Sequence, residues 1–417
     1  MERPLEGVNV VELSIAVAGP SCGATLADYG ADVIKIEPPG GDSQRWIVAG
    51  LGMEAADPYI ESPHFYQINR GKRSVCLDLR SEAGMKALET LLSQADVFLS
   101  NIRYGSLQSL GLGAEELLQR HPQLIVCPMT GWGMEGPEAD KPVYDVAGFW
   151  ARSSAAASHT PRDAYPPVLV PGFGDVTTAL SAVGGICAAL VSRAKTGRGR
   201  ALTTSLLRTG MHVNGWALSN YFARGRVVRW GDRAKTGNPA ATVYKAGDGK
   251  SFWLIGFEGP RHWSPTVRAI GKPEWIEEPK YKTPGARRKN EAEIVAGMDD
   301  IFRTRPLSEW AAAFDREGVW WCPVQDAEEV ASDPQAVAAG AFVTIPPGPA
   351  DHEAGRTDLQ SVASPVDFLG TDTTPGSVPA LGEHTRSVLE DAGLDDSTIE
   401  MVLTAYRTGA PKGRARL

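Results

Sequence analysis

The segment Gly172-Phe173-Gly174-Asp175 places a carboxylate beside two glycines, just ahead of a long apolar stretch. An aspartate at such a position can act as a helix N-cap, because its carboxylate accepts backbone N–H groups of the first turn. The same carboxylate can attack an acyl carbon and form a covalent intermediate. Flanking N–H groups would then hold the oxyanion. The local pattern alone leaves both interpretations open.

A second acid lies thirty residues earlier, in the pair Tyr144-Asp145. The pair offers a hydroxyl group and a carboxylate, and either can orient a nearby carboxylate by hydrogen bonding. We therefore treat Tyr144, Asp145 and Asp175 as one candidate catalytic group.

Basic side chains gather between residues 69 and 80, in a chain that is acidic overall. Four of them fall within eleven positions, and further arginines follow a glycine-rich turn and a predicted strand end; the set is Arg70, Lys72, Arg73 and Arg80, with Arg45 and Arg103. Lysine and arginine bind phosphate through charge-assisted hydrogen bonds. A run of charges is more often a solvated face, so the phosphate interpretation needs independent support.

These residues need a scaffold, and the first 135 residues supply one by alternating β-branched runs with helical stretches. Strands are predicted at 8–13, 32–37, 97–101 and 124–127, and helices at 21–29, after Ser81 and at 114–120. Such alternation predicts an α/β fold with a doubly wound, Rossmann-like parallel sheet. Ligands bind such sheets outside the carboxyl ends of the strands, which points to the corner Ser14–Pro20.

The rest of the chain predicts a second domain. Apolar helices are expected from Asp175 to about residue 194 and from about 203 to 223, and a hairpin turn at Asp248-Gly249. At ~150 residues per domain, the length fits two or three domains. We expect a large α/β domain at 1–225, a smaller inserted α+β domain at 232–340, and a segment at 345–417 that returns to the large domain.

The composition excludes several classes of protein. Of 417 residues, 42% are apolar and 22% charged, which argues against a disordered chain or a disulfide mini-protein. The net charge of −8 argues against nucleic-acid binding over the whole surface. Neither G-x-G-x-x-G nor a P-loop motif occurs, so the sequence lacks the motifs that typically bind nicotinamide dinucleotides and nucleoside triphosphates.

The five cysteines and seven histidines indicate neither a disulfide framework nor a metal site. No two cysteines have C-x-x-C spacing, and no H-E-x-x-H pair occurs. The N-terminus lacks the apolar region of a signal peptide, and no run reaches the ~20 apolar residues of a membrane span. We therefore expect a cytoplasmic protein with no metal, no membrane and no nucleic-acid partner.

Several motifs occur in a fixed order over nearly the whole chain. They are Ala18-Gly19-Pro20, the stretch 26–37, Asn69-Arg70-Gly71-Lys72-Arg73-Ser74, Gly131-Trp132-Gly133, Gly174-Asp175, Lys195-Thr196-Gly197-Arg198-Gly199 and Leu381-Gly382-Glu383-His384-Thr385. In this order the chain resembles the class III CoA-transferases. That family includes formyl-CoA:oxalate and carnitine CoA-transferases, and it shares its fold with α-methylacyl-CoA racemase.

The resemblance implies a role for each candidate residue. Asp175 matches the family's nucleophile, which forms an aspartyl-acyl anhydride and then an aspartyl-CoA thioester, and Tyr144-Asp145 matches a pair near the thioester. CoA is then a substrate, with no tightly bound cofactor. The expected CoA contacts, with the basic cluster added, are Val17, Ala18, Lys72, Arg73, Leu77, Asp78, Leu79, Arg80, Asn101, Ile102 and Arg103.

The resemblance also implies partners: an acyl-CoA, a free carboxylic acid and a second copy of the chain. Family members are interlocked homodimers, in which each ring-shaped subunit threads through the other. Formyl-CoA transferases have Gln where this chain has Val17, Arg where it has Pro38, and a glycine-rich flap that is missing near 256–259. We therefore expect a bulkier, more apolar acceptor than oxalate. Candidates for the lining of its pocket are Trp150, Trp230, Trp253 and Trp263, although such a tryptophan is more often a core residue than a ligand contact.

Three alternatives remain beside the CoA-transferase. An acyl-CoA racemase or isomerase of the same fold is disfavoured, because Tyr144 stands where racemases have a histidine base. An idle acyl-CoA-binding subunit of a heteromeric transferase is disfavoured by the retained Gly174-Asp175. A nicotinamide oxidoreductase is disfavoured by the missing glycine fingerprint.

Overall fold

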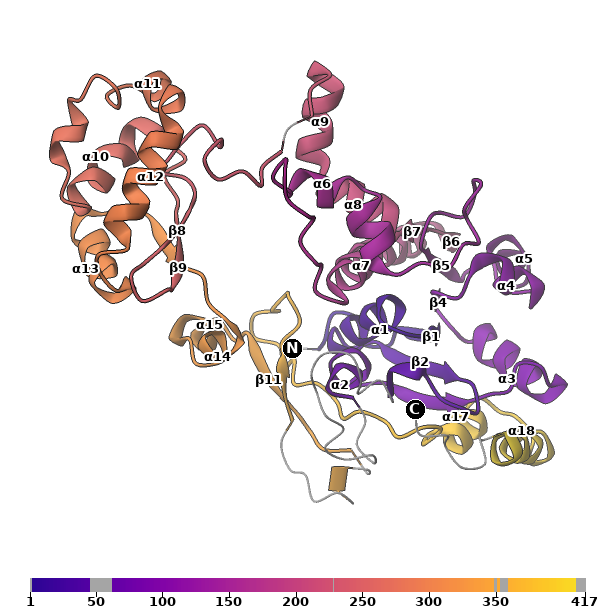
Figure 1. The fold of residues 1–417 in the computed structure, drawn as a ribbon. Coiled ribbons are helices and arrows are strands. Elements are labelled where there is room, and N and C mark those ends of the chain that lie inside the picture. Colours follow the sequence, from indigo (N-terminus) through magenta and orange to yellow (C-terminus); the bar gives the residue numbers. More distant parts are fainter. Residues whose placement is uncertain (1, 46–61, 228, 349–350, 353–358, 410–417) are drawn as a thin grey trace. The chain divides into compact units, whose positions relative to one another are not determined.

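The computed structural model describes residues 2–45, 62–227, 229–348, 351–352 and 359–409 (Figure 1). The chain divides into two compact units. Unit 1 comprises residues 1–155, 169–215 and 337–417, and unit 2 comprises residues 156–168 and 216–336. The predicted domain ranges 1–225, 232–340 and 345–417 stay a prediction.

Unit 1 is built on a seven-stranded sheet with the order β3-β2-β1-β4-β5-β6, in which β7 also pairs with β5. Every pairing in this sheet is parallel. The strands are β1 Asn9–Leu13, β2 Asp32–Glu37, β3 Arg73–Cys76, β4 Val97–Ser100, β5 Ile125–Thr130, β6 Arg200–Ala201 and β7 Thr204–Ser205. The prediction of an α/β fold with a large parallel sheet is confirmed.

Helices cover both faces of this sheet, as a doubly wound arrangement requires. Successive residues of a strand point to opposite faces, and Val10 and Val11 of β1 accordingly belong to two separate apolar clusters. One cluster includes α1 (Ala18–Asp28) and α7 (Phe173–Thr196). The other includes α3 (Glu82–Ser93), α5 (Ala114–Arg120), α17 (Thr385–Asp391) and α18 (Asp396–Gly409).

The remaining elements of this part of the chain are shorter. They are α2 (Pro63–Asn69), α4 (Tyr104–Ser109), α6 (Ala155–Ser158), α8 (Leu206–Val213), the 3₁₀ turn η1 (Ser43–Arg45), the π-helix η2 (Val146–Ala151) and the antiparallel pair β11 (Phe342–Ile345) and β12 (Leu359–Val362). As predicted, Ser81 caps α3, and its hydroxyl oxygen accepts the N–H of Gly84.

The helix predicted from about residue 203 to 223 is two helices, α8 and α9 (Gly215–Arg224), separated at Asn214. Residues 204–205 are not helical, because they form β7 beside β5. Ser205 then caps α8, and its hydroxyl oxygen accepts the N–H of Arg208. Edge pairing with the sheet therefore outweighs the helical pattern at the start of this segment.

Unit 2 has a three-stranded antiparallel sheet in the order β10-β9-β8. Its strands are β8 Val243–Lys245, β9 Ser251–Leu254 and β10 Trp321–Pro323, and the hairpin turn lies at Asp248-Gly249 as predicted. Gly249 has φ +85, which suits glycine there. The helices of this region are α10 Gly259–Ala269, η3 Pro273–Ile276, α11 Pro284–Lys289, α12 Glu291–Phe302, α13 Leu307–Glu317, α14 Ala327–Ala331 and α15 Pro334–Ala338.

An aromatic core holds unit 2 together. Phe252, Phe302 and Phe314 are fully buried, and their rings contact one another edge-on or tilted. Trp263 belongs to the same core and is 2% exposed. Of the four tryptophans predicted to line an acid pocket, Trp263 is therefore a core residue in this structure.

Helix α7 is the long apolar helix of unit 1. Among the described residues it is the one helix that could cross a membrane, judged by its length of 24 residues and its composition. Core helices of soluble proteins pass the same test. One face of α7 is buried against the apolar cluster that contains α1, through Ala179, Val183 and Ile186.

Candidate active site

The sheet changes direction between β1 and β4. The chain proceeds from β1 outward to β2 and β3, and β4 then starts on the other side of β1. In open parallel sheets, ligands bind at such a switch point, outside the carboxyl ends of the strands. Here those ends are Leu13 and Ser100, which are register partners. The sheet therefore predicts a binding site beside the corner that follows Leu13.

Asn101, which follows β4, forms two hydrogen bonds with this corner. Its Oδ1 accepts the N–H of Ile15 at 2.9 Å, and its Nδ2 donates to the Ile15 carbonyl oxygen at 2.6 Å. The corner leads directly into α1, whose first residue is the buried Ala18. The structure thus brings together two stretches that were predicted to contact CoA, Val17-Ala18 and 101–103.

Val17 also lies beside the start of α7. Gly172 precedes α7 in a left-handed conformation, with φ +83, and a Cβ at this position would lie 3.6 Å from Val17 Cγ1. Gly172 is therefore the N-cap residue of α7, and Asp175 is the third residue of the helix. The interpretation of Asp175 as the N-cap is wrong, because the N-cap lies three residues earlier, at Gly172.

Asp145 and Asp175 lie together at this helix start. Asp145 is 5% exposed, and its Oδ2 accepts the N–H of Gly174 at 3.1 Å. A Cβ on Gly174 would lie 2.6 Å from Phe149 and 2.9 Å from the Asp145 Cβ. Only glycine therefore lets η2, which follows Asp145, approach the first turn of α7 this closely.

The Asp175 carboxyl group has a strongly shifted pKa. Burial, and after it the nearby charge of Asp145, raise its pKa to about 7. Among the described residues, no cation forms an ion pair with either acid. A carboxyl group that titrates near neutral pH, next to a ligand-binding sheet edge, is typical of a reacting group.

Tyr144 lies next to this pair in the sequence, but its side chain is 77% exposed. Its carbonyl oxygen accepts the N–H groups of Ala147 and Gly148, which start the π-helix η2. Among the described residues, its hydroxyl group has no hydrogen-bond partner. The expected orienting role of Tyr144 therefore stays a prediction.

Two of the predicted CoA contacts, Arg80 and Arg103, are exposed arginines that differ in their partners. Arg80 binds Asp78 through two hydrogen bonds of 2.9 Å. Arg103 precedes α4 at its N-cap position and forms no ion pair with the described residues. The neighbouring predicted contacts are apolar: Leu77 is buried, and Leu79 and Ile102 pack partly buried against the core. Of these two arginines, Arg103 is therefore the one without an ion-pair partner in the described part of the chain.

The expected phosphate contacts of Lys72 and Arg45 do not agree with where these side chains lie. The Lys72 ammonium is buried and donates to Pro20 O at 2.8 Å and Asn69 Oδ1 at 3.0 Å. It also ion-pairs with Glu12 Oε2 at 2.7 Å. Burial lowers the pKa of Lys72 to about 8, although Glu12 opposes the shift.

Arg45 and Arg73 are likewise paired within the fold. Arg45 is fully buried, binds both oxygens of Glu37 and lies 4.1 Å above the ring of Phe65. Arg73 is half-buried and donates to Asp32 at 2.9 Å. Within the run between residues 69 and 80, Lys72 and Arg70 therefore pair with the buried acids Glu12 and Asp28, and these two pairs join α1, α2 and the sheet.

Comparison with known proteins identifies the family. A model of CoA-transferase family III matches residues 5–385, which is most of the chain. The chain belongs to this family. A Clostridioides difficile (R)-2-hydroxy-4-methylpentanoate CoA-transferase is 30% identical over 403 residues, with 95% of this chain and 97% of the relative covered. Human succinyl-CoA:glutarate CoA-transferase is 29% identical, with 97% and 89% covered.

The fold agrees with a solved structure of the same family. A CAIB/BAIF family protein from Brucella suis superposes with a TM-score of 0.81 at 29% identity, and the match covers 94% of this chain and 100% of that one. The protein is therefore a class III CoA-transferase, and CoA thioesters are the substrates of its family. Among the described residues, no three His, Cys, Asp or Glu side chains are grouped to hold a metal ion.

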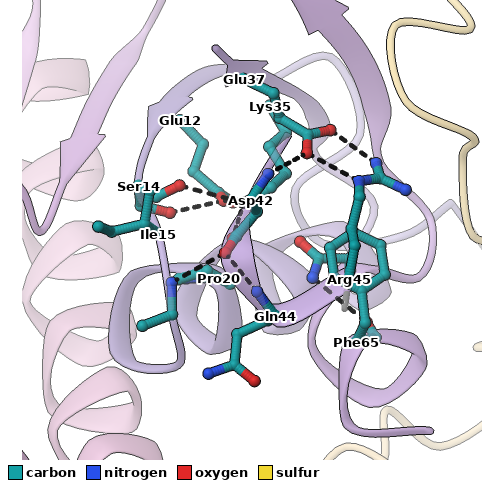
Figure 2. A network of polar contacts seen from close by, with 12 residues as sticks. Glu12, Ser14, Ile15, Pro20, Lys35, Glu37, Asp42, Gln44, Arg45 and Phe65 are labelled. Atoms are coloured by element: carbon teal, nitrogen blue, oxygen red, sulfur yellow. Dashed lines mark hydrogen bonds and ion pairs between the residues drawn. The ribbon is translucent and has the colours of Figure 1, made fainter. Parts of the chain in front are cut away.

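One feature of this CoA-transferase was not found from the sequence: a buried polar network beneath the β1–α1 corner (Figure 2). Lys35 ion-pairs with Glu12 and Asp42, and all three side chains are fully buried. The signal in the sequence was the pair Lys35 and Glu37 alternating with the apolar residues Ile34 and Ile36 of β2. A central strand has no solvent-facing side, so charges there must be paired.

Proposed function

We propose that this class III CoA-transferase moves CoA from an acyl-CoA thioester to a free carboxylic acid, with Asp175 as the nucleophile. The observation that carries the proposal is Asp175 itself, at the start of α7 beside Asp145, with its pKa raised to about 7 mainly by burial. A carboxylate of this pKa is more basic than an ordinary aspartate, and a substantial fraction is still ionised at neutral pH. Both properties favour nucleophilic attack.

The first half of the reaction removes CoA from the donor. The Asp175 carboxylate attacks the thioester carbonyl carbon, the C–S bond breaks, and CoA leaves as its thiolate. An aspartyl-acyl anhydride remains. The thiolate then attacks the aspartyl carbonyl carbon of this anhydride, which releases the donor acid as a carboxylate and leaves an aspartyl-CoA thioester.

The second half reverses these steps with a new acid. The acceptor carboxylate attacks the aspartyl-CoA carbonyl carbon and expels the CoA thiolate, giving a second anhydride. The thiolate attacks the acceptor's acyl carbon, the new acyl-CoA forms, and the Asp175 carboxylate is regenerated. No proton is gained or lost overall, so the reaction needs ionised Asp175 but no separate base.

Asp145 acts in this proposal as a positioning residue. Its carboxylate accepts the N–H of Gly174, the residue immediately before the nucleophile, and this bond fixes the first turn of α7. Its negative charge also raises the pKa of Asp175, after the larger effect of burial. Both effects support a nucleophile held in place and kept basic.

For the CoA moiety, the corner at Val17-Ala18 and the exposed Arg103 and Arg80 are the proposed contacts. Helix α1 begins at this corner, and helix N-termini favour anionic groups. Each charge-assisted hydrogen bond to a phosphate contributes roughly 1.5–3 kcal/mol, less where water screens it.

For the acceptor, we propose an apolar carboxylic acid bulkier than oxalate. The support is Val17, an apolar side chain beside Gly172 at the start of the nucleophile's helix. The Clostridioides difficile relative is named for a branched 2-hydroxy acid, and the human one for two dicarboxylic acids. A panel of acyl-CoA and free-acid pairs, with CoA esters followed by mass spectrometry, tests this choice. Faster transfer to oxalate than to branched acids would contradict it.

We also propose that two copies of the chain pair in solution as an interlocked dimer in the cytoplasm. In unit 1, apolar side chains of α7 and α8 are exposed, among them Val191, Met211 and Val213. Burial of such side chains against a second copy would be favourable. Sedimentation measures the mass directly, and a monomer at micromolar concentration would contradict the pairing.

The test that separates transfer from racemisation follows solvent deuterium. A 2-methylacyl-CoA incubated in heavy water should gain no deuterium at its α-carbon, while an added free acid is converted to its CoA ester. Deuterium uptake without transfer would favour the racemase, and neither reaction, despite tight CoA binding, would favour an idle binding subunit.

A further inference from the structure

The corner between β1 and α1 contains a strained residue. Ala16 has φ +60, and among the described non-glycine residues only Ser154 shares a positive φ. An L-residue in this left-handed region brings its Cβ close to the following carbonyl oxygen, which costs free energy. Such a conformation persists only where surrounding contacts enforce it, and it occurs often at ligand sites.

Side chains from other elements form hydrogen bonds with several backbone groups of this corner. Ser100 Oγ donates to the Leu13 carbonyl oxygen at 2.6 Å, and Lys35 Nζ donates to the Ser14 carbonyl oxygen at 3.1 Å. Asn101 binds both the N–H and the carbonyl oxygen of Ile15. Ordinary turns leave such groups to water or to neighbouring backbone, so this corner is unusually fixed.

Asp42 makes the contact to the strained residue itself. Its Oδ1 accepts the N–H of Ala16 at 3.2 Å and that of Gln44 at 3.0 Å. Its Oδ2 accepts from Lys35 at 3.0 Å. Figure 2 shows the Asp42 carboxylate between the corner on one side and Lys35 on the other. Because the carboxylate is fully buried and anchored by Lys35, it cannot rotate away without losing an ion pair.

We propose that Asp42 is a positioning residue for CoA binding, which holds Ala16 in its left-handed conformation and thereby sets Val17 and Ala18 at the start of α1. The inference rests on the proposed function, since it assumes that CoA lies along this corner. Asp42 does not touch the ligand in this account. It acts through Ala16, and its removal lets the corner relax to a conformation that no longer fits CoA.

The experiment compares Asp42→Ala with the double variant Asp42→Ala/Ala16→Gly. Glycine adopts positive φ without the Cβ penalty, so it lowers the cost that Asp42 offsets. Asp28→Asn is the matched control, because Asp28 is also buried and ion-paired, to Arg70, but lies at the far end of α1. The dissociation constant for CoA by calorimetry, KM and kcat for an acyl-CoA, and Tm are measured for each.

We expect Asp42→Ala to weaken CoA binding and raise KM about tenfold, the size that the left-handed cost of one alanine corresponds to. Its kcat should change less. Adding Ala16→Gly should restore most of the affinity while leaving the lowered Tm unrestored. Ala16→Gly alone should bind CoA as wild type does, and Asp28→Asn should lower Tm without changing CoA affinity.

Three results would overturn the inference. If the double variant binds CoA no better than Asp42→Ala does, the conformation of Ala16 does not connect Asp42 to CoA binding. Equal loss of affinity in Asp28→Asn would reduce the effect to general stability. Unchanged CoA binding in Asp42→Ala, with normal binding by wild type, would contradict this inference and leave the proposed function standing. A wild-type protein that binds no CoA would instead contradict the proposed function itself.

Discussion

Two groups of carboxylates in unit 1 differ in whether a cation lies beside them. Beneath the β1–α1 corner, Glu12 and Asp42 each ion-pair with Lys35, and no charge of this trio is left unpaired. At the start of α7, Asp145 and Asp175 lie together, and no described residue supplies a cation to either. The ion pairs of the first group stabilise the sheet. The second group has no neutralising cation, which suits a carboxyl group that reacts.

The pKa values reflect this difference. Burial alone would raise the pKa of Glu37, a neighbour in the first group, but the hydrogen bonds and charge of Arg45 outweigh it and lower the pKa to about 2. Burial of Asp175 meets no such compensation, and its pKa rises to about 7. Removal from water therefore gives a permanent anion at Glu37 and a titrating group at Asp175, depending on whether a cation is present.

The largest expected effect is the loss of transfer in Asp175→Ala. Removing the nucleophile should lower kcat by at least about 10³-fold, as for other enzymes that lose a covalent nucleophile. Asp175→Asn should lose activity equally, because an amide keeps the shape but not the nucleophilicity. Both proteins should stay folded by circular dichroism and still bind CoA. Near-native kcat in either variant would place Asp175 outside the chemistry.

In the group that is paired with Lys35, removing the cation is expected to lower the stability of the protein. Lys35→Met leaves Glu12 and Asp42 with one cation fewer, and breaking a buried ion pair costs about 3–5 kcal/mol. For a domain of this size, Tm should fall by roughly 5–10 °C. Lys282→Met, which removes the exposed pair with Glu277, is the control and should change Tm little. Equal, small shifts in both variants would mean that the network does not stabilise the sheet.

The pH dependence of kcat/KM tests the unpaired group. Because the Asp175 pKa is raised to about 7, the ionised nucleophile is lost as the pH falls through 7, and kcat/KM should fall with it. Asp145→Asn removes the neighbouring charge but keeps an oxygen for the Gly174 N–H. The acidic limb should therefore move to lower pH, by about one unit. If the acidic limb of the kcat/KM profile does not move, the charge of Asp145 does not raise the pKa of Asp175.

The smallest expected effect distinguishes two exposed arginines. Arg103 has no ion-pair partner among the described residues, whereas Arg80 already binds Asp78 through two hydrogen bonds. A phosphate must displace that partner at Arg80 but not at Arg103. Arg103→Ala should raise KM for acyl-CoA by about five- to tenfold at low ionic strength, and Arg80→Ala by less. The reverse order would show that pairing in the free protein does not predict which cation binds CoA.

The sequence predicted strands β1, β2, β4 and β5 because their signals are local, but it missed the shorter strands β3, β6 and β7. Val10-Val11 and Ile34 lie in β-branched runs, and the caps and glycine stops between them mark each crossover. The pairing of Lys72 with Glu12 could not be predicted, because the two residues are distant in the sequence and a run of charges does not show which side chains are buried.

The candidate site was only partly predictable for the same reason. Asp175 was identified from its glycines and the family resemblance, but its place as the third residue of α7 depends on the left-handed Gly172. The contact between Asp145 and Gly174 joins two segments that are far apart in the sequence. Asp42 gave no chemical signal at all, since its role depends on the conformation of Ala16.

The most direct test of the account is to trap the covalent intermediate. The protein is incubated with acyl-CoA and hydroxylamine, digested, and the peptides are analysed by mass spectrometry. We predict an aspartyl hydroxamate on the peptide that contains Asp175, formed only when acyl-CoA is present and absent in Asp175→Asn. A modification on Asp145 or another carboxylate, or turnover with no trapped carboxylate at all, would contradict the claim that Asp175 carries the acyl and CoA groups.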